Sequence, residues 1–239
     1  MLKYLRTLRV FLLNTIAPYV CLGCNQKITP TTIPPLCATC ASQIKLRDAF
    51  SCSRCYKRIP GITKNCNCKH SFAVGSALSY SDTRTQSMIR NLKYQKVEIA
   101  GAVLASFLGT YLKRSGIDLS KWVVVSVPLS WKRYSKRGFN QSEIILEALK
   151  TNEGLPLVIA HKALRRIKDN KPQARTKNYR ERRKNMDGVF EVTDPRAVQG
   201  KAVIIFDDVF TSGETIRECV RVLRKAGVRR IIALTVAKA

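Results

Sequence analysis

Residues 203–215 read VIIFDDVFTSGET, and this stretch limits the possible fold more than any other part of the chain. An apolar run leads into Asp207 and Asp208, which predicts a buried strand over 201–209 that ends in two carboxylates. Because a buried carboxylate without a partner is very costly, we expect both acids to meet a ligand or a metal ion rather than partners in the core. Hydroxyl side chains and a glycine follow, and a helix is expected from Glu214 to Ala226, ended by Gly227.

The same alternation of strands and helices extends through the larger part of the chain. Residues 72–80, FAVGSALSY, read as a strand, and runs rich in β-branched residues predict further strands at 122–129 and 229–236. Apolar residues three and four apart predict helices at 84–95, 98–114 and 140–150, the last with Asn140 as its N-cap. The order indicates an α/β fold in which helices flank a parallel sheet on both faces. Ligands of such sheets bind at the carboxyl ends of the strands, where the two aspartates are expected.

The loop after the acids has the composition of a phosphate-binding turn. Backbone N–H groups at a helix start, together with Thr and Ser hydroxyls, can cradle a phosphate. Paired carboxylates suit ribose hydroxyls or a magnesium ion that holds them. The segment therefore fits a ribose 5-phosphate, with Asp207 and Asp208 facing the ribose. The expected 5′-phosphate loop consists of Thr211, Ser212, Gly213, Glu214 and Thr215.

Eight of the nine cysteines lie between positions 21 and 68, and they form two sets of four. Four thiolates in closely spaced pairs close a tetrahedral zinc site, so each set predicts one structural zinc in place of a hydrophobic core. Free thiols are the alternative, and His70 is an alternative ligand in the second set. Paired cysteines of this kind fit a reducing cytosol better than a disulfide framework. The sets are Cys21, Cys24, Cys37 and Cys40, and Cys52, Cys55, Cys66 and Cys68.

The N-terminal residues 1–20 predict a short amphipathic helix, because Leu2, Leu5, Leu8, Leu12 and Ile16 recur at helical spacing. We expect it to pack on the first cysteine set, and contact with a membrane surface is the alternative. No segment has the roughly 20 apolar residues of a spanning helix.

The charge balance favours an anionic partner. The chain has 43 Lys and Arg against 16 Asp and Glu, a net charge of +27. Such an excess suits nucleic acid, phosphorylated metabolites or an anionic membrane. The densest basic stretches are 132–137 and 161–184, and the second could be a mobile hood over the site, a solvated loop or a surface for a nucleic-acid strand. The expected nucleic-acid residues are Lys132, Tyr179, Arg180, Arg182, Arg183 and Lys184.

Three segments together resemble known families. VIIFDDVFTSGET resembles the phosphoribosyl-pyrophosphate signature of type I phosphoribosyltransferases, although Phe210 stands where that pattern usually has a smaller aliphatic residue. VPLSWKRYSKRGFNQS (127–142) is similar to a segment of the ComF family, as are Gln173 and ERRKNMDGVF (181–190). That family also has an N-terminal module of four cysteines, and the second cysteine set occurs in only some of its members.

The resemblance implies a type I phosphoribosyltransferase-like fold preceded by a small zinc-ribbon-like module. The expected division is a helix at 1–20, a double zinc module at 21–70 and a phosphoribosyltransferase-like domain at 72–239. The resemblance also implies a cytoplasmic protein of natural transformation that binds single-stranded DNA, with other competence proteins, such as a DNA-uptake helicase, as partners. Phosphoribosyl pyrophosphate would bind with magnesium, its pyrophosphate on Arg133, Arg137 and Gly138, and the resemblance implies that Asp207 and Asp208 are the catalytic acids. The alternative is an active phosphoribosyltransferase of nucleotide or amine metabolism whose acceptor the sequence does not identify.

Overall fold

The computed structural model describes residues 19–28, 35–59, 61–62, 66–95, 98–169 and 187–239. The helix expected over 1–20 lies almost entirely outside these residues. Gln173 and five of the expected nucleic-acid residues, Tyr179, Arg180, Arg182, Arg183 and Lys184, also lie outside them.

A seven-stranded sheet forms the centre of the described part, in the order β2-β1-β3-β9-β8-β4-β5. The strands from β3 to β5 in this order run parallel, which confirms the expected α/β fold. The four strands expected from the sequence appear as β3 (Ala73–Ser79), β4 (Trp122–Ser126), β8 (Ala202–Phe210) and β9 (Arg230–Lys238). The edge strand β5 (Val158–Ile159) has only two residues, too few for an apolar pattern to be recognised.

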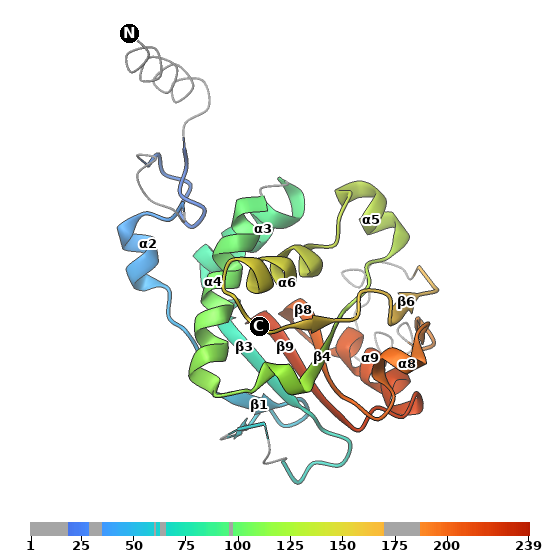
Figure 1. The fold of residues 1–239 in the computed structure, drawn as a ribbon. Coiled ribbons are helices and arrows are strands. Elements are labelled where there is room, and N and C mark those ends of the chain that lie inside the picture. Colours follow the sequence, from blue (N-terminus) through green and yellow to red (C-terminus); the bar gives the residue numbers. More distant parts are fainter. Residues whose placement is uncertain (1–18, 29–34, 60, 63–65, 96–97, 170–186) are drawn as a thin grey trace.

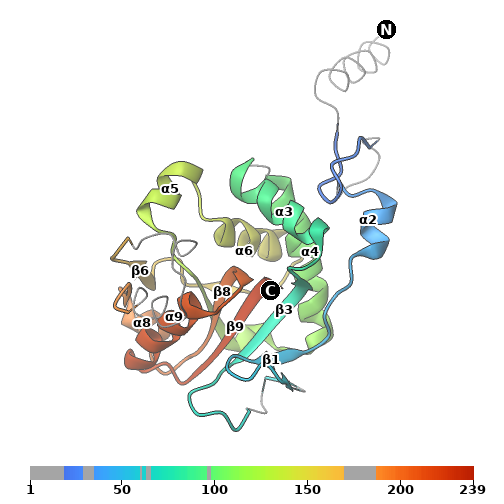
Figure 2. The same ribbon diagram turned by 180° about the vertical axis from the view of Figure 1, so that it is seen from behind.

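Helices cover both faces of the sheet, as Figures 1 and 2 show. One face packs against α3 (Thr83–Tyr94), α4 (Glu98–Ser115) and α6 (Gln141–Thr151), and the other against α9 (Glu214–Lys225). Alternate residues of β8 supply the two cores, Ile204 and Phe206 on the first face, Val203 and Ile205 on the second. This alternation follows from the two-residue period of a strand and explains why the run reads as continuously apolar.

Side-chain caps fix where the helices begin. The Asn140 side chain accepts a hydrogen bond from the Ser142 N–H at 3.1 Å, which confirms its expected role at α6. Asp82 caps α3 by accepting from the N–H groups of Arg84 and Thr85. Each cap satisfies backbone donors that have no partner within their own helix.

The second cysteine segment joins the main sheet. Strand β1 (Phe50–Cys52) pairs antiparallel with β3, and β2 (Arg58–Ile59) pairs with β1. Ser51 lies opposite Val74 in this register, so hydrogen bonds cross the position where the sequence suggests a domain boundary. The segment that carries the second cysteine set is thereby part of the same sheet as β8, the strand of the acid pair.

Several short elements surround the sheet. Helix α5 (Trp131–Arg137) follows β4, where the sequence suggests a loop, and α2 (Ala38–Gln43) belongs to the first cysteine set. Strands β6 (Leu164–Arg166) and β7 (Phe190–Val192) form a separate antiparallel pair, and α8 (Pro195–Val198) and η1 (Leu119–Lys121) are single turns. None of the helices in the described ranges is long and apolar enough to cross a membrane.

Candidate functional site

The two acids lie near the carboxyl end of β8, which continues for two residues beyond them. Phe210, the last residue of β8, still pairs in register with Lys238 of β9. The Asp208 N–H donates to Asp207 Oδ1 at 2.9 Å, and Ser142 Oγ donates to the same oxygen at 3.5 Å. The start of α6 therefore contacts the acid pair directly.

Asp208 has a partner within the protein, which corrects the expectation that both acids are reserved for a ligand. Asp208 is 5% exposed, and its Oδ2 forms an ion pair with Lys93 Nζ of α3. Among the described residues this oxygen accepts no well-aligned hydrogen bond, so the ammonium group is its one close polar contact. A buried carboxylate needs such a counter-charge, because the interior does not solvate it.

The environments of the two carboxyls push their pKa values apart. Burial and the neighbouring charge of Asp208 raise the pKa of Asp207 to about 8, although Lys93 acts in the opposite direction. Burial also opposes ionisation of Asp208, but its contacts, led by the charge of Lys93, outweigh burial and lower its pKa. Near neutral pH the pair therefore holds one proton, on Asp207, and one negative charge, on Asp208.

The loop after the acids contains one residue that must be glycine. Gly213 has a φ of +76° at the N-cap of α9, and a Cβ atom there would lie 2.4 Å from the ring of Phe210. Gly213 offers no capping side chain, so the first N–H groups of α9 have no side-chain cap. Helix N-termini of this kind bind phosphate groups.

The side chains of the loop divide into two groups. Thr211 is exposed, and Ser212 and Thr215 are partly exposed, so their hydroxyls are accessible beside the helix start. Glu214 is only 4% exposed, and its carboxylate accepts from Arg217 at 2.7 Å. Glu214 would therefore contribute only its backbone N–H to the expected 5′-phosphate loop, because its carboxylate is paired with Arg217.

Helix α5 separates the two arginines expected to bind pyrophosphate. Arg133 lies on its exposed side, whereas Arg137 is 8% exposed and donates to Gln141 Oε1 at 2.7 Å. The Arg137 guanidinium also lies 5.2 Å from the ring centroid of Tyr94, and its charge helps to lower the pKa of Asp208. Gly138 ends α5 with a φ of +84° and accounts for the turn. Of the two arginines, Arg137 is the one placed beside the acid pair.

Both cysteine sets are assembled as expected, each with four sulfur atoms within 4.8 Å of one another. Backbone N–H groups donate to the sulfurs, such as Cys37 N to Cys21 Sγ at 3.2 Å and Arg54 N to Cys52 Sγ at 3.3 Å. Burial opposes thiolate formation, yet the hydrogen bonds lower the pKa of Cys21 to about 6 and that of Cys52 to about 7. Such donor sets fit zinc, which would crosslink the loops that supply its ligands.

Two of the three Cys-x-x-Cys pairs, Cys21–Cys24 and Cys52–Cys55, form turns with matching backbone features. The N–H of Cys21 donates to Gln26 O at 2.8 Å, and that of Cys52 donates to Lys57 O at 2.9 Å. The residue after each pair, Asn25 or Tyr56, is left-handed, with φ near +60°. His70 is not a member of the second set, and Cys219 is buried within α9, away from both sets.

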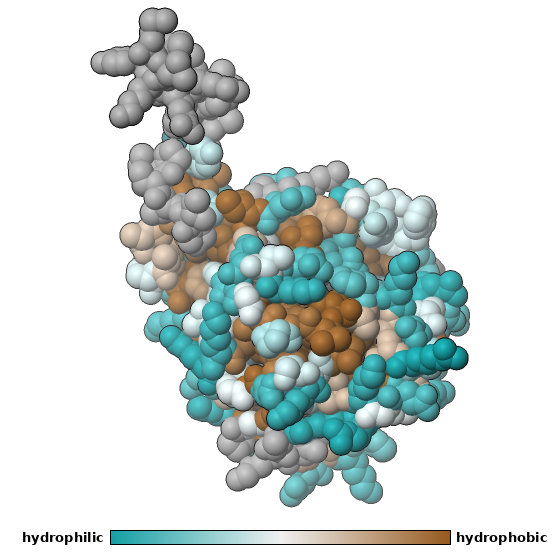
Figure 3. All heavy atoms as spheres, viewed as in Figure 1, coloured by the Kyte–Doolittle hydropathy of each residue, from teal (hydrophilic) through white to brown (hydrophobic). Residues whose placement is uncertain are grey.

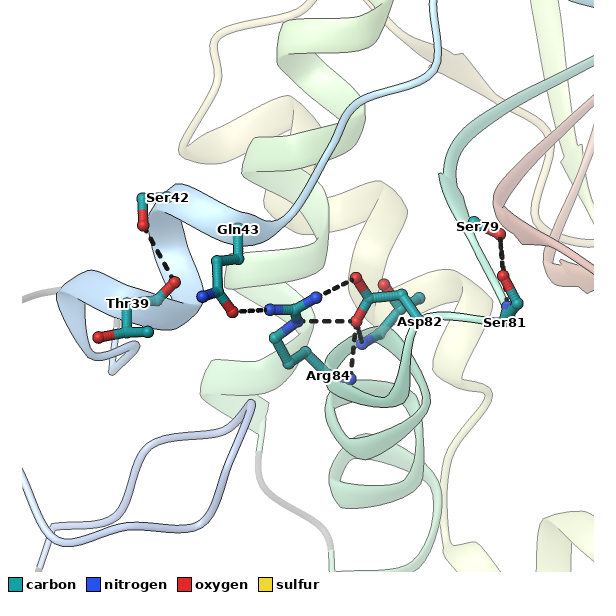
Figure 4. Close-up of polar contacts among 8 residues, drawn as sticks. Thr39, Ser42, Gln43, Ser79, Ser81, Asp82 and Arg84 are labelled. Carbon is teal, nitrogen blue, oxygen red and sulfur yellow. Dashed lines mark hydrogen bonds and ion pairs between the residues drawn. The ribbon is translucent and has the colours of Figure 1, made fainter.

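The first cysteine set docks on α3 through a polar cluster. In Figure 4, Gln43 of α2 accepts from the guanidinium of Arg84, which also donates to both carboxylate oxygens of Asp82. The Asn91 side chain adds a hydrogen bond to Leu22 O at 3.4 Å. These contacts attach the first set to the helix that carries Lys93.

The described part of the expected nucleic-acid surface is α5. Lys132 is exposed there, and the neighbouring Trp131 and Tyr134 are 76% and 47% exposed. The view in Figure 3 shows mostly hydrophilic side chains around a hydrophobic area near its centre.

Sequence reasoning missed Lys93 and Ser142. Lys93 lies in no motif, and Ser142 ends the segment 127–142 without any pattern that assigns its hydroxyl to the site. Only the packing of α3 and α6 against β8 brings the two side chains to the acids.

A family model for the phosphoribosyl transferase domain matches residues 135–239. Competence protein F of Haemophilus influenzae is 27% identical over 92% of this chain and 90% of its own length. The DNA utilization protein YhgH of Escherichia coli K12 is 27% identical over 89% and 87%. Competence protein ComFC of Bacillus subtilis is 24% identical over 80% and 79%.

Among solved structures, a hypoxanthine phosphoribosyltransferase from Staphylococcus aureus is 14% identical, with a TM-score of 0.38 over 63% of this chain and 71% of that one. The assignment of a phosphoribosyl transferase domain depends on the family model, and the similarity over most of the chain depends on the three relatives. The chain therefore contains a phosphoribosyl transferase domain over residues 135–239 and is similar over most of its length to the competence protein F, ComFC and YhgH proteins.

Proposed function

We propose that this protein handles DNA in natural transformation and binds phosphoribosyl pyrophosphate in the pocket at the end of β8. The observation that carries the proposal is the acid pair, fixed by Lys93 beside an uncapped start of α9. In this proposal the protein acts in the cytosol, on single-stranded DNA.

Each part of the sugar phosphate has a complementary group in the site. The Asp208 carboxylate can accept from ribose hydroxyls, and protonated Asp207 can both donate and accept. The N–H groups after Gly213, with the hydroxyls of Thr211 and Ser212, suit the 5′-phosphate. Arg137 suits the pyrophosphate. Magnesium, when bound, would neutralise phosphate charge, and the Asp208 carboxylate is the kind of ligand that it prefers.

Support for DNA binding comes from α5 and from the relatives. Trp131 and Tyr134 are exposed among Lys132, Arg133 and Lys136, and exposed aromatic rings among basic groups bind single strands by stacking and by charge. Two of the relatives are named competence proteins and one a DNA utilization protein, which makes DNA the preferred anionic partner.

Calorimetric titration with phosphoribosyl pyrophosphate and magnesium tests the pocket. We expect wild type to bind and Asp207→Asn to bind at least tenfold more weakly, while Asp194→Asn, the same substitution outside the site, binds as wild type. Asp207 is the better residue to change, because Asp208→Asn would leave Lys93 unpaired. Absence of binding by wild type would remove the pocket from the proposal. Fluorescence anisotropy with a single-stranded oligonucleotide at low salt tests the DNA part independently.

The second candidate is an active phosphoribosyltransferase, favoured by the complete set of acid pair and phosphate loop. Positioning and electrostatic stabilisation would then account for most of the catalysis, with bond breaking at the anomeric carbon. Release of pyrophosphate on addition of a nucleobase or an amine would establish this activity. If the ligand binds and no pyrophosphate appears with any acceptor, the pocket serves for binding alone.

A further inference from the structure

A groove of about 540 Å³ lies between the second cysteine set and α9. Its walls carry five basic side chains and two acidic ones. Both acids are already engaged, because Glu214 pairs with Arg217 at 2.7 Å and Glu218 pairs with Arg221 at 2.6 Å. The remaining cations are Arg54, Lys69 and Arg224.

Two of these cations, Arg54 and Arg224, are held in place by backbone carbonyls without being neutralised. Arg54 donates to Lys69 O at 3.1 Å, and Arg224 donates to His70 O and Ser71 O at 3.3 and 3.2 Å. Carbonyl oxygens fix a guanidinium group but leave its charge intact. Within the described ranges none of the three has a carboxylate within 4.0 Å, so the groove keeps an excess of positive charge.

The side chain of Tyr56 lies in the same groove as the three cations. Tyr56, the left-handed residue after the Cys52–Cys55 turn, lines the groove and is 49% exposed. The turn holds its backbone, because the Tyr56 N–H donates to Cys52 O at 3.1 Å. Lys238 Nζ lies 4.8 Å from the centroid of its ring, so one ring face already contacts a cation. Fixed cations next to an exposed ring form the kind of surface that binds nucleotides by phosphate contacts and base stacking.

We propose that this groove binds a segment of single-stranded DNA, with phosphates on Arg54, Lys69 and Arg224 and a base stacked on Tyr56. The inference rests on the proposed DNA function and adds a second surface to α5. It also assigns a use to the second cysteine set: its turn presents both Arg54 and Tyr56 to the strand. The groove borders the phosphate loop, because Arg217 on its wall donates to Ser212 O at 2.6 Å.

The test compares variants of equal charge, since a net charge of +27 attracts DNA to the whole surface. Arg54→Gln with Lys69→Gln removes two charges from the groove. Lys45→Gln with Lys57→Gln removes two exposed charges of the same region that do not line it. Binding of a fluorescent oligothymidylate is measured between 50 and 300 mM salt by anisotropy. For two lost phosphate contacts we expect the log–log salt slope to fall by about 1.4 in the groove variant only.

Tyr56→Ala should weaken binding about fivefold or more, and Tyr56→Phe should leave it near wild type, because stacking needs the ring and not the hydroxyl.

Zinc content and thermal unfolding of each variant show whether the turn is intact. A photo-crosslink from 5-iodouracil to Tyr56 in the unmodified protein supplies evidence free of folding effects. The groove proposal is overturned if wild type binds DNA, the groove variant has the same salt slope as its control, and crosslinks form only at other residues. The proposed DNA function would still stand in that case. Equal competition by thymidine monophosphate reassigns the groove to a free nucleotide. No binding by wild type at low salt overturns both.

Discussion

The Arg217 guanidinium donates a hydrogen bond of 2.8 Å to the carbonyl oxygen of Ser53, which lies between Cys52 and Cys55. The same guanidinium donates to Ser212 O at 2.6 Å. One side chain therefore connects the second cysteine turn to the loop proposed to hold phosphate.

Replacing Arg217 should loosen both loops together. Hydrogen bonds from a charged group contribute roughly 1.5–3 kcal/mol each, so we expect Arg217→Ala to lower the free energy of unfolding by about 2 kcal/mol or more. Hydrogen exchange followed by mass spectrometry should show faster exchange in 52–56 and in 212–215. Arg229→Ala removes an exposed charge and serves as the control. Faster exchange in only one of the two loops would contradict the connection.

The pair of Lys93 and Asp208 should couple strongly. Removing one partner of a buried ion pair costs roughly 3–5 kcal/mol, so Lys93→Met should be strongly destabilised in denaturant unfolding. Lys93→Met with Asp208→Asn should recover much of the loss, since no uncompensated charge remains buried. Lys113→Met breaks a pair whose lysine is 57% exposed, and should cost less than about 1 kcal/mol. Additive effects in the double variant would show that the two side chains do not interact.

Asp207 should make stability fall as the pH rises. Its pKa is about 8 in the folded protein and near 4 in the unfolded chain, so between these values the folded state keeps a proton that the unfolded state has released. The stabilisation of the folded state by Asp207 is therefore complete below about pH 4 and lost by about pH 8. Over this window the free energy of unfolding falls by up to about 1.4 kcal/mol per pH unit. Asp207→Asn cannot titrate, so the stability difference between variant and wild type should change over this window. A constant difference from pH 5 to 9 would contradict the raised pKa.

Gly213 should tolerate no side chain. Gly213→Ala places a Cβ atom 2.4 Å from the Phe210 ring and imposes a φ of +76° on alanine. Gly200 has a similar φ of +71° and open space around its Cβ position, so Gly200→Ala measures the backbone cost alone, about 1 kcal/mol. We expect Gly213→Ala to exceed this cost by 1 kcal/mol or more in thermal or denaturant unfolding, and to weaken binding of phosphoribosyl pyrophosphate. Equal costs for the two variants would show that Phe210 moves aside freely.

The purified chain should contain two zinc ions. Each set offers four sulfurs within 4.8 Å, and zinc takes four such ligands. Cys52→Ser should reduce the content to one ion, and Cys219→Ser should leave it at two, because Cys219 is buried in α9. Elemental analysis of the protein, purified without chelators, measures this. One ion in wild type would rule out one of the two sites.

The sequence by itself determined the features that depend on short stretches of chain. The four main strands and the helices between them follow from apolar periodicity, and the cap at Asn140 and the turn at Gly213 follow from local backbone chemistry. The cysteine spacing likewise predicted two sets of four sulfurs, because two residues between thiols form a turn without help from the rest of the fold.

Only the tertiary structure decided which residues surround the acid pair and where the second cysteine set lies. Lys93 and Asp208 are 115 positions apart, and no local pattern distinguishes this lysine from an exposed one. Strands β1 and β2 are too short to show a period, so only their hydrogen bonds to the sheet reveal that the cysteine turn faces α9. The periodicity of apolar residues shows which face of a helix or strand is buried. It does not show which side chains pack against that face, because these come from elements far away in the sequence and depend on burial over the whole chain.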